Sequence, residues 1–506
     1  MRERILSLPL IIILMGLGSV TMYLPAAHAA VVQDYGTMRA FFQAANMFAI
    51  LTIVLGIATS NRTINRPGRS YLLALMAAFV ALPLMLAVPF SLAVPDTAYL
   101  NAYVEMVSDF STTGLTLFDD PLRLPPSVHL WRALVGWMGG LFILVAAVAI
   151  LAPMNLGGFE VLSTPHAGRG ASDQSQAAWH GDGSERLTRY TAKIFPIYAG
   201  LTLALWIILL VLGDTPLVAI SHAMSVLSTS GISPIGGLND AGSGMRGEAI
   251  IFLVLMFAIS RQAYAADRLG DGFSRFISDP EFRLGLFLVA VITGMLFLRH
   301  WVGALDVNGV DSLPSASQAL WGGVFTVMSF LTTTGFESMA WSAASQWSGL
   351  ETPGILLMGL ALIGGGVATT AGGVKLLRVY ALYKHGTREM DRLVHPSSVG
   401  GSGIAARRLR RQGAHVAWVF FMLFAISIAV TITSFGLAGI EFETSITLAV
   451  ASLSTTGPLI NIAAQSPIDV SSFNDATKLI LAGAMVLGRL ETLAIIALLN
   501  PGFWRK

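Results

Sequence analysis

The sequence contains no cysteine and few charged residues. The absence of cysteine excludes disulfides, thiolate metal sites and cysteine nucleophiles. Only 12% of the 506 residues are charged, whereas soluble domains carry roughly a quarter charged residues. With 54% hydrophobic residues and a mean hydropathy of +0.69, the composition indicates a protein that lies in a membrane. Strand-like alternation is missing, so we expect helical spans, and the net charge of +2 gives no reason to expect a nucleic-acid partner.

Apolar runs close to the ~20 residues that a spanning helix needs recur along the whole chain. We predict ten spans from them, at these approximate positions: 5–24, 40–59, 71–93, 131–154, 190–212, 248–266, 283–301, 353–382, 414–436 and 477–499. Most Lys and Arg residues then fall on the side that holds both termini, which is the cytoplasmic side under the positive-inside rule. The sequence therefore predicts a multi-pass protein of the bacterial inner membrane with cytoplasmic N and C termini.

The N-terminal segment allows two interpretations. Arg2, Arg4, an apolar core and Ala27-His28-Ala29 resemble a secretory signal peptide with its cleavage site. The charge distribution favours an uncleaved first helix, because both arginines then share a side with the later basic loops.

Many acidic residues fall on the predicted outer side, Asp119 and Glu337 among them. An acidic outer vestibule would raise the local concentration of cations and steer them inward. Taken alone, ordinary solvated loops explain the same distribution.

Four apolar segments that are too short to cross a bilayer lie between pairs of predicted spans. Segments of this length are typical of re-entrant or buried pieces, and they cover about 98–110, 215–228, 316–331 and 442–453. Each ends in three hydroxyl residues and a glycine, a tetrapeptide that we call a filter segment: Ser111-Thr112-Thr113-Gly114, Ser228-Thr229-Ser230-Gly231, Thr332-Thr333-Thr334-Gly335 and Ser454-Thr455-Thr456-Gly457. Helix-packing motifs of small residues explain the composition, but they do not explain the fourfold placement.

The filter segments predict a site that coordinates ions. Non-helical backbone at membrane depth is tolerated only where protein or a water-filled cavity satisfies its polar groups. Four such segments converging on one axis would present rings of backbone carbonyls, which can replace the hydration shell of K⁺. Glycine permits the required backbone angles without a Cβ in the path. The candidate ion-binding residues are Thr112, Thr113, Gly114, Thr229, Ser230, Gly231, Thr333, Thr334, Gly335, Thr455, Thr456 and Gly457.

A glycine-rich stretch is a candidate for a movable gate. The predicted span at 353–382 is too long for one straight crossing, and its middle, residues 364–373, contains five glycines and cannot hold a regular helix. A break at membrane depth should line the pathway, with close helix packing as the alternative. The glycine spacing does not match a nucleotide-binding P-loop. The candidate gate residues in this stretch are Gly364, Gly365, Gly366, Gly372 and Gly373.

Arg489 is expected to be the single basic side chain inside a span. A charge there costs several kcal/mol unless it faces a cavity or a partner, so we interpret it as a pore-facing electrostatic barrier below the filter segments. The alternative is a structural pair with Glu491, which the two-residue spacing on a helix disfavours.

Further motifs extend along the chain: Trp137-Met138-Gly139-Gly140, the run from Ile363 to Lys375, Arg392-Leu393-Val394-His395-Pro396, Gly488-Arg489-Leu490-Glu491 and Pro501-Gly502-Phe503-Trp504-Arg505. Together with the filter segments, they resemble the TrkH family, in the TrkH/KtrB/HKT superfamily of potassium transporters. Two extra spans before the first filter segment favour TrkH over KtrB. Departures from the family pattern are Ser230, Pro458 after the last filter glycine, and the absence of cysteine from the loop at 364–373.

The resemblance implies an all-α polytopic membrane protein with four pseudo-symmetric helix–pore-loop–helix repeats around one pore, plus two extra N-terminal transmembrane helices. The implied units are 1–66 for the two N-terminal helices, then repeats at 67–165, 184–270, 280–396 and 412–506. The resemblance also implies K⁺ uptake by a Trk system, K⁺ as the transported ion with no other cofactor, and a gating role for Arg489.

Partners are implied as well. The regulator would be a cytoplasmic nucleotide-binding ring protein of the TrkA type, and the chain would act as a homodimer. The predicted inner loops 156–189, 267–282 and 384–413 are long and basic. Positive-inside topology accounts for their sign but not for the length of one basic cluster, which consists of Arg407, Arg408, Arg410 and Arg411.

Two other functions compete with K⁺ uptake. The first is a Na⁺-selective or Na⁺-coupled transporter. In the superfamily, Na⁺ preference resembles replacement of the first filter glycine by serine, and all four glycines are present here, which favours K⁺. The second is a polytopic membrane enzyme, but the sequence offers no nucleophile and base at a plausible spacing and no dinucleotide motif between a strand and a helix.

Overall fold

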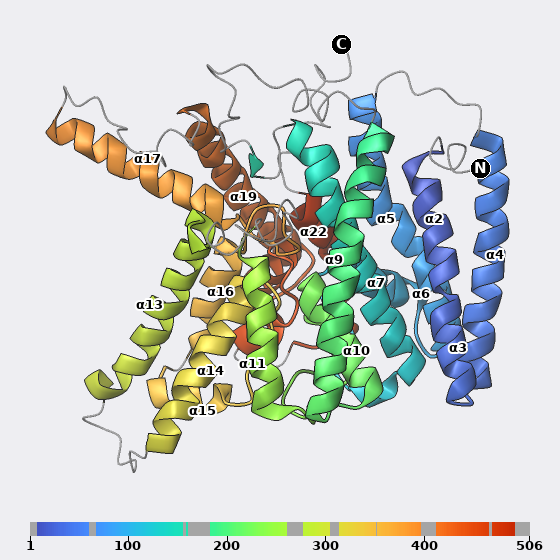
Figure 1. Cartoon of the computed structure of the whole chain (residues 1–506), viewed down its shortest axis with the longest axis horizontal. Helices are drawn as coiled ribbons and strands as arrows, with labels where there is room; N and C mark the ends of the chain where they lie inside the picture. Colours follow the sequence, from blue (N-terminus) through green and yellow to red (C-terminus); the bar gives the residue numbers. More distant parts are fainter. Residues whose placement is uncertain are drawn as a thin grey trace.

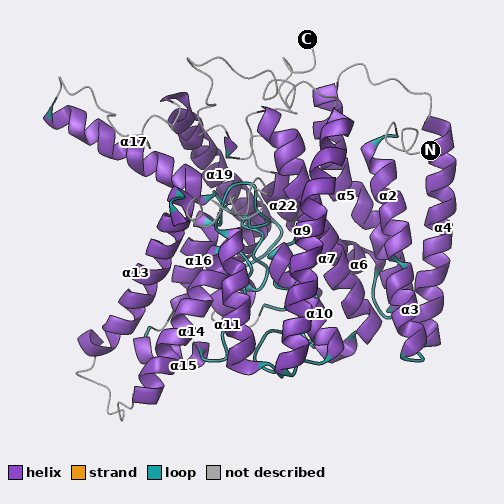
Figure 2. Ribbon diagram, viewed as in Figure 1, coloured by secondary structure: helices purple, strands orange, loops and turns teal. Residues whose placement is uncertain are grey.

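The computed structural model describes residues 8–59, 67–154, 158–159, 183–260, 277–303, 313–350, 352–395, 411–464 and 468–490. Within these ranges the regular structure is helical and includes no strand, as Figures 1 and 2 show. Seven helical segments in this part of the chain are long and apolar enough to cross a bilayer. The prediction of an all-α polytopic membrane protein is therefore confirmed.

The described helices follow the order of the predicted units. The N-terminal unit contains α2 (Leu10–Thr21), α3 (Tyr23–Val31) and α4 (Tyr35–Thr59). The first two repeats contain α5 (Pro67–Ala93), α6 (Tyr99–Phe110), α7 (Pro126–Ala146), α9 (Gly183–Leu212), α10 (Pro216–Ser228) and α11 (Gly244–Leu255). The last two contain α13 (Pro280–Gly303), α14 (Leu313–Leu331), α15 (Trp341–Ser348), α16 (Pro353–Ile363), α17 (Leu376–Val394), α19 (Arg411–Leu437), α20 (Phe442–Leu453), α21 (Leu459–Ala463) and α22 (Asp475–Leu490). The expected unit boundaries near 66, 165, 270 and 396 lie in or beside undescribed segments and stay predictions.

Three predicted spans correspond to shorter described helices. The spans at 248–266, 353–382 and 477–499 are represented by α11, α16 and α22. The first of these helices continues as the 3₁₀ turn η5 (Met256–Ala258). Residues 261–276, which follow this turn, and all residues after Leu490 lie outside the described part of the chain.

The first span extends further than the sequence predicts. Instead of ending near residue 24, the helical path continues through α3 to Val31. Ala27-His28-Ala29 lies within this helix, and Ala29 is fully buried. His28 Nδ1 lies 2.8 Å from Ser127 Oγ at the start of α7, within hydrogen-bond distance. The extra turn is thus held by contacts with the first repeat.

The four short predicted segments are helices, and we call α6, α10, α14 and α20 the pore helices. Each ends at, or one residue before, the first residue of a filter segment. α7 brings two of them together, because most of its side chains are buried, as expected for a helix that is apolar all round. A Cβ at Gly139 would clash with the Phe110 carbonyl oxygen, and one at Gly140 would lie 2.7 Å from Ser228 Cβ. The Trp137–Gly140 motif therefore lets α7 contact the ends of both α6 and α10.

The predicted span at 353–382 is interrupted. α16 ends at Ile363 and α17 begins at Leu376. Gly364 and Gly373, near the two ends of the connecting loop, have φ of 73° and 75°, in the left-handed region that glycine adopts without a Cβ clash. α17 then projects away from the bundle at the upper left of Figure 1.

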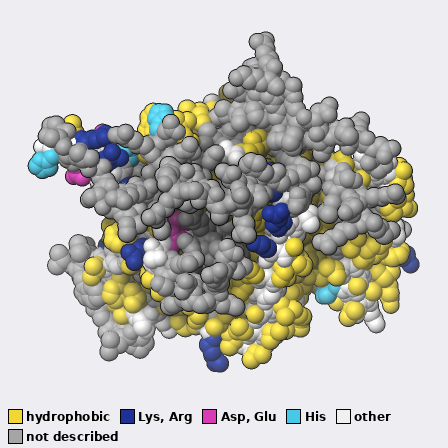
Figure 3. Space-filling view, turned by 45° about the horizontal axis from the view of Figure 1, so that its top comes forward, with side chains coloured by type: hydrophobic (Ala, Val, Ile, Leu, Met, Phe, Trp, Pro, Cys, Tyr) yellow, Lys and Arg dark blue, Asp and Glu magenta, His cyan; other side chains and the backbone are white. Residues whose placement is uncertain are grey.

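Large parts of the surface are apolar, and α17 carries a group of basic side chains. α19 exposes large apolar groups, among them Trp418, Phe421 and Ile426, as expected for a helix that faces lipid. In Figure 3, hydrophobic side chains cover the lower right flank, whereas Lys and Arg side chains gather on the projection at the upper left. That projection is α17, which ends in the polar stretch Lys384–Arg392.

Candidate functional site

The four filter segments lie side by side in a closed ring. The ring can be traced from the surroundings of the filter glycines. A Cβ added to each glycine would meet the next filter segment in chain order, or the residue directly after that segment, and the fourth glycine would meet the first segment. The atoms that the added Cβ would meet are the Ser230 carbonyl oxygen for Gly114, the Thr334 carbonyl oxygen for Gly231, the Pro458 ring for Gly335 and the Leu115 nitrogen for Gly457. Side chains at Gly114, Gly231 and Gly457 would therefore collide with the neighbouring backbone, and one at Gly335 would press against the Pro458 ring.

The segments share one backbone conformation. The second residue of each is left-handed, a region that threonine rarely occupies: φ is 56° at Thr112, 52° at Thr229, 57° at Thr333 and 55° at Thr455. The third residue of each donates its N–H to a carbonyl oxygen of the preceding pore helix: Thr113 to Ser108 (2.8 Å), Ser230 to Ser225 (3.0 Å), Thr334 to Ser329 (2.9 Å) and Thr456 to Ala451 (2.8 Å). The chain thus reverses in the same way after each pore helix.

The hydroxyl groups are also paired alike. The first and third side chains of every segment form a hydrogen bond: Ser111 with Thr113 (2.7 Å), Ser228 with Ser230 (3.0 Å), Thr332 with Thr334 (3.1 Å) and Ser454 with Thr456 (3.1 Å). Ser230 therefore makes the contact that threonine makes elsewhere. The hydroxyl groups of Thr112 and Thr455, the second residues of two segments, are buried without a hydrogen-bond partner, so these oxygens and the backbone carbonyls are the candidate ligands of an ion.

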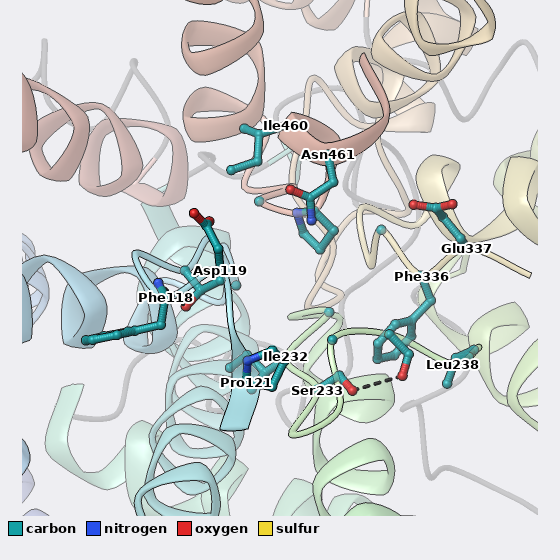
Figure 4. A pocket seen from close by; sticks show the side chains of 18 of the residues that line it. Phe118, Asp119, Pro121, Ile232, Ser233, Leu238, Phe336, Glu337, Ile460 and Asn461 are labelled. Carbon is teal, nitrogen blue, oxygen red and sulfur yellow. Dashed lines mark hydrogen bonds between the residues drawn. The ribbon is translucent and has the colours of Figure 1, made fainter. Parts of the chain in front are cut away.

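An outer cavity of about 380 Å³ opens onto the ring. All four filter glycines line it, together with Asp119, Glu337 and Asn461. Figure 4 shows Asp119 and Glu337 on opposite sides of the cavity. Burial raises the pKa of both carboxyl groups, and the charge of Asp469 further raises the pKa of Asp119.

The glycine-rich loop lies against the inner side of the ring. Gly372 donates its N–H to Thr333 Oγ1 (2.7 Å), and a Cβ at Gly372 would collide with the Ser454 carbonyl oxygen and with Thr455 Oγ1. Thr370 Oγ1 donates to the Leu227 carbonyl oxygen at the end of α10 (3.1 Å). The loop thus lies against the end of the second pore helix and against the third and fourth filter segments.

The other loop glycines permit close backbone approach. A Cβ at Gly365 would lie 2.7 Å from the Ala258 carbonyl oxygen, and one at Gly366 would collide with the Ile259 carbonyl oxygen. Gly366 also donates its N–H to the Ala258 carbonyl oxygen (3.0 Å). Glu281, a fully buried residue at the start of α13, accepts the Val367 N–H at Oε1 (2.8 Å). Contacts with the end of η5 and with the start of α13 therefore hold residues 365–367 of the loop.

Arg489 points at this loop. Its side chain is 5% exposed, and Nη1 donates to the Thr370 carbonyl oxygen (2.7 Å). Arg489, Lys375, Gly372 and Gly373 line a cavity of about 30 Å³, which has space for about two water molecules. This small cavity lies between two cationic side chains and the loop.

A comparison with known proteins decides the family. The family model described as "TrkH: Cation transport protein" matches residues 37–239 and 247–502. The chain belongs to the TrkH family. It is 28% identical to "Trk system potassium uptake protein TrkH" of Salmonella typhimurium and to its namesake of Escherichia coli, covering 96% of each chain in both comparisons. The crystal structure of the potassium transporter TrkH from Vibrio parahaemolyticus matches the whole of both chains with 25% identity and a TM-score of 0.80.

This TrkH-family chain contains buried cations that sequence reasoning missed. The expectation that Arg489 is the single basic residue inside a span is wrong, because Arg132, Lys375, Arg378 and Lys478 are also buried in the predicted spans. Arg132 lies on α7, and its charge is compensated by residues from another helix: Nη2 lies 2.6 Å from Glu105 Oε1 and Nε lies 3.6 Å from Asp109 Oδ2. Lys375 Nζ donates to the Ala371 carbonyl oxygen.

Sequence reasoning also missed a set of polar contacts behind the ring. Nine residues before the first three filter glycines stand Glu105, His222 and Thr326, which we call the brace residues. Each binds the chain just beyond its own filter glycine: Glu105 Oε2 with Leu117 N (2.9 Å), His222 Nε2 with Ser233 Oγ (2.9 Å) and Thr326 Oγ1 with Ser338 N (3.2 Å). The sequence signal for these contacts was the common spacing of nine residues before a filter glycine. It was not recognised because the three residues are of different types.

Several expected contributors lie outside the described residues. Glu491, the proposed alternative partner of Arg489, is one of them. The others are Pro396, the cluster members Arg407, Arg408 and Arg410, and the C-terminal motif from Pro501 to Arg505. Their predicted roles stay predictions.

Proposed function

We propose that this chain carries K⁺ across the bacterial inner membrane, from the outer cavity through the ring of filter segments to the cytoplasm. The observation that carries the proposal is the closed contact between the four glycine-centred segments. The backbone carbonyl groups are the proposed ion ligands, and that of Thr113 also accepts the Gly457 N–H (2.6 Å). The names of the relatives, potassium uptake proteins of the Trk system, support K⁺ as the ion, and transport rather than catalysis as the activity.

The candidate ligands follow from this geometry. Carbonyl oxygens of the twelve residues predicted from the sequence would replace the hydration shell of the ion, segment by segment. The filter glycines keep side chains out of the contacts between segments. Serine at one of them would press against a neighbouring segment. The superfamily resemblance associates serine at the first filter glycine, Gly114, with Na⁺ preference.

Gating belongs to the same proposal. The glycine-rich loop touches the inner side of the ring, and Arg489 binds that loop while carrying a fixed positive charge. A loop displaced toward the cytoplasm would widen the narrow cavity beneath the filter segments. A cytoplasmic regulator of the TrkA type would control this movement, and the active unit would be a homodimer with both termini in the cytoplasm. Copurification of such a regulator from native membranes, and the mass of the complex, test these two points.

The central test is growth of a K⁺-uptake-deficient bacterium at low external K⁺. The wild-type chain, coexpressed with its regulator, should restore growth, and Gly335→Ser should weaken this rescue and make it sensitive to Na⁺. Gly386→Ser is the matched control, because a Cβ at Gly386 meets nothing within 4 Å. Wild-type chain that is present in the membrane with its regulator and restores no growth would refute the proposal. Na⁺ uptake by that same chain would favour the Na⁺ alternative.

A further inference from the structure

The fourth filter segment departs from the other three at its glycine. Gly114, Gly231 and Gly335 have φ of 70°, 68° and 83°, whereas Gly457 lies outside the left-handed region. Gly457 instead donates its N–H to the Thr113 carbonyl oxygen of the first segment (2.6 Å). The outer end of the ring is therefore not fourfold symmetric.

Pro458 occupies the asymmetric position. The residues after the other three filter glycines are Leu115, Ile232 and Phe336. A Cβ at Gly335 would lie 3.0 Å from each of Cβ, Cγ and Cδ of Pro458, and one at Gly231 would lie 2.7 Å from its Cγ. A single pyrrolidine ring thus fills the space against both the second and the third filter segments.

The fourth segment also lacks the polar brace. The position nine residues before Gly457 is Leu448, whose side chain has no group that can form a hydrogen bond. Pro458 instead is the N-cap residue directly before the short helix α21, with φ of −59°, close to the angle that its ring fixes. Leu459 and Ile460, which follow, are buried. Apolar packing and a rigid proline therefore hold this part of the mouth.

We infer that Pro458 is a specificity-determining residue of the pathway, because its ring sets the distance between the second, third and fourth filter segments at the outer mouth. This inference rests on the proposed K⁺ transport. Selection between K⁺ and Na⁺ depends on the size of the carbonyl cage or on the number of its dipoles. Both change if the segments can approach one another. Loss of the ring would let the outer carbonyls close around a smaller ion.

The test compares ion fluxes through full-length protein reconstituted into liposomes. Pro458→Ala removes Cγ and Cδ, and we expect the K⁺/Na⁺ flux ratio to fall about tenfold, equivalent to about 1.4 kcal/mol of lost discrimination between the two ions. Pro458→Val keeps a branched side chain near Gly231 and Gly335, and its ratio should lie between those of Pro458→Ala and the wild type. Pro95→Ala, at an exposed position that does not line the cavity, is the matched control and should keep the wild-type ratio.

The outcomes separate the inference from the proposed function. A selective wild-type chain with a lowered ratio in the Pro458 variants supports the inference. A selective wild-type chain with an unchanged ratio in both variants overturns it, and if the alanine variant does not fold, an unchanged ratio in Pro458→Val is sufficient. A wild-type chain that shows no preference for K⁺ refutes the proposed function, and the inference with it. Size-exclusion profiles and thermal unfolding in detergent identify the folded variants.

Discussion

Arg489 donates a hydrogen bond from Nη1 to the carbonyl oxygen of Thr370, at 2.7 Å. The bond joins α22 of the fourth repeat to the middle of the glycine-rich loop of the third. Lys375, the last residue of this loop, donates a hydrogen bond from Nζ to the Ala371 carbonyl oxygen within the same loop. Each cation therefore lines the small cavity and binds a carbonyl oxygen of the loop, and under the proposed function each would place a positive charge beside the pathway.

Arg489→Ala should raise K⁺ flux. The substitution removes the charge that repels the ion and the bond that retains the loop, and we expect about a tenfold rise, equivalent to a barrier lowered by about 1.4 kcal/mol. Flux should also depend less on the regulator, while the K⁺/Na⁺ ratio stays the same because the filter carbonyls are untouched. The measurement is flux per folded molecule in liposomes. Arg39→Ala, at an exposed position of α4, is the charge-matched control.

The competing result is a loss of folded protein, expected if Arg489 mainly holds two helices together. Yield and unfolding temperature separate this result from a change of gating. Folded Arg489→Ala protein with flux at or below the wild-type level would contradict the assignment of this arginine to the gate.

Gly372→Ala should displace the loop by steric means alone. The new methyl group would collide with the Ser454 carbonyl oxygen and Thr455 Oγ1, so the loop must move away and Thr333 Oγ1 loses its N–H donor. We expect a several-fold higher flux in the absence of the regulator, measured by tracer uptake into liposomes. Gly386→Ala adds the same methyl group in open space and should behave like the wild type. Equal flux in both folded variants would show that the loop does not close the pathway.

The filter segments and the helix break could be predicted because both depend on local sequence. Three hydroxyl residues and a glycine recur after short apolar segments, and the structure brings these tetrapeptides into mutual contact. Five glycines between Gly364 and Gly373 likewise interrupt a helix in any surroundings. The position of the break could be predicted, but the partners of the loop could not.

The buried charges could not be predicted from sequence windows. Arg132 is followed by an apolar stretch, and Glu105 and Asp109, which compensate its charge, belong to a different helix. The brace residues Glu105, His222 and Thr326 differ in type although they share a register. A composition-based reading treats them as unrelated, and only alignment of the pore helices on their filter glycines reveals the common position. Tertiary contacts assign these roles.

Glu248→Ala should lower stability strongly. Glu248 on α11 is buried and accepts three hydrogen bonds from the third repeat, from Trp321 Nε1 (2.8 Å), Ser338 Oγ (2.8 Å) and Met339 N (2.5 Å). Alanine leaves these donors without their acceptor, and each bond to a charged group contributes about 1.5–3 kcal/mol, so we expect a loss of about 3 kcal/mol or more. The measurement is the midpoint of thermal unfolding in detergent.

Glu443→Ala provides the control for Glu248. Glu443 is an exposed residue in the first turn of α20, and surface substitutions of this kind usually change stability by about 0.5 kcal/mol or less. Glu248→Gln, which keeps acceptor capacity on one atom, should lie between the wild type and Glu248→Ala. Equal unfolding midpoints for Glu248→Ala and Glu443→Ala would mean that the three hydrogen bonds do not stabilise the contact between the second and third repeats.

Uptake at low K⁺ should fall as the external pH is lowered, and it should begin to fall above the ordinary carboxyl range near pH 4. Burial raises the pKa of Glu337, and burial together with the charge of Asp469 raises the pKa of Asp119. A raised pKa means that each group takes up its proton at a higher pH than a free carboxyl group. The outer cavity then loses negative charge, and with it the local excess of cations.

The double variant Asp119→Asn with Glu337→Gln should remove this pH dependence. It should also lower uptake at neutral pH by about threefold at low ionic strength, because two carboxylates no longer attract cations to the mouth. The difference from the wild type should shrink in high salt, which screens charges over about 10 Å or less. Asp34→Asn is the control: Asp34 caps α4 by accepting the Thr37 N–H, asparagine caps equally well, and the residue does not line the cavity. A double variant that keeps the pH profile of the wild type would exclude these two carboxyl groups as the titrating site, because the variant no longer contains either of them.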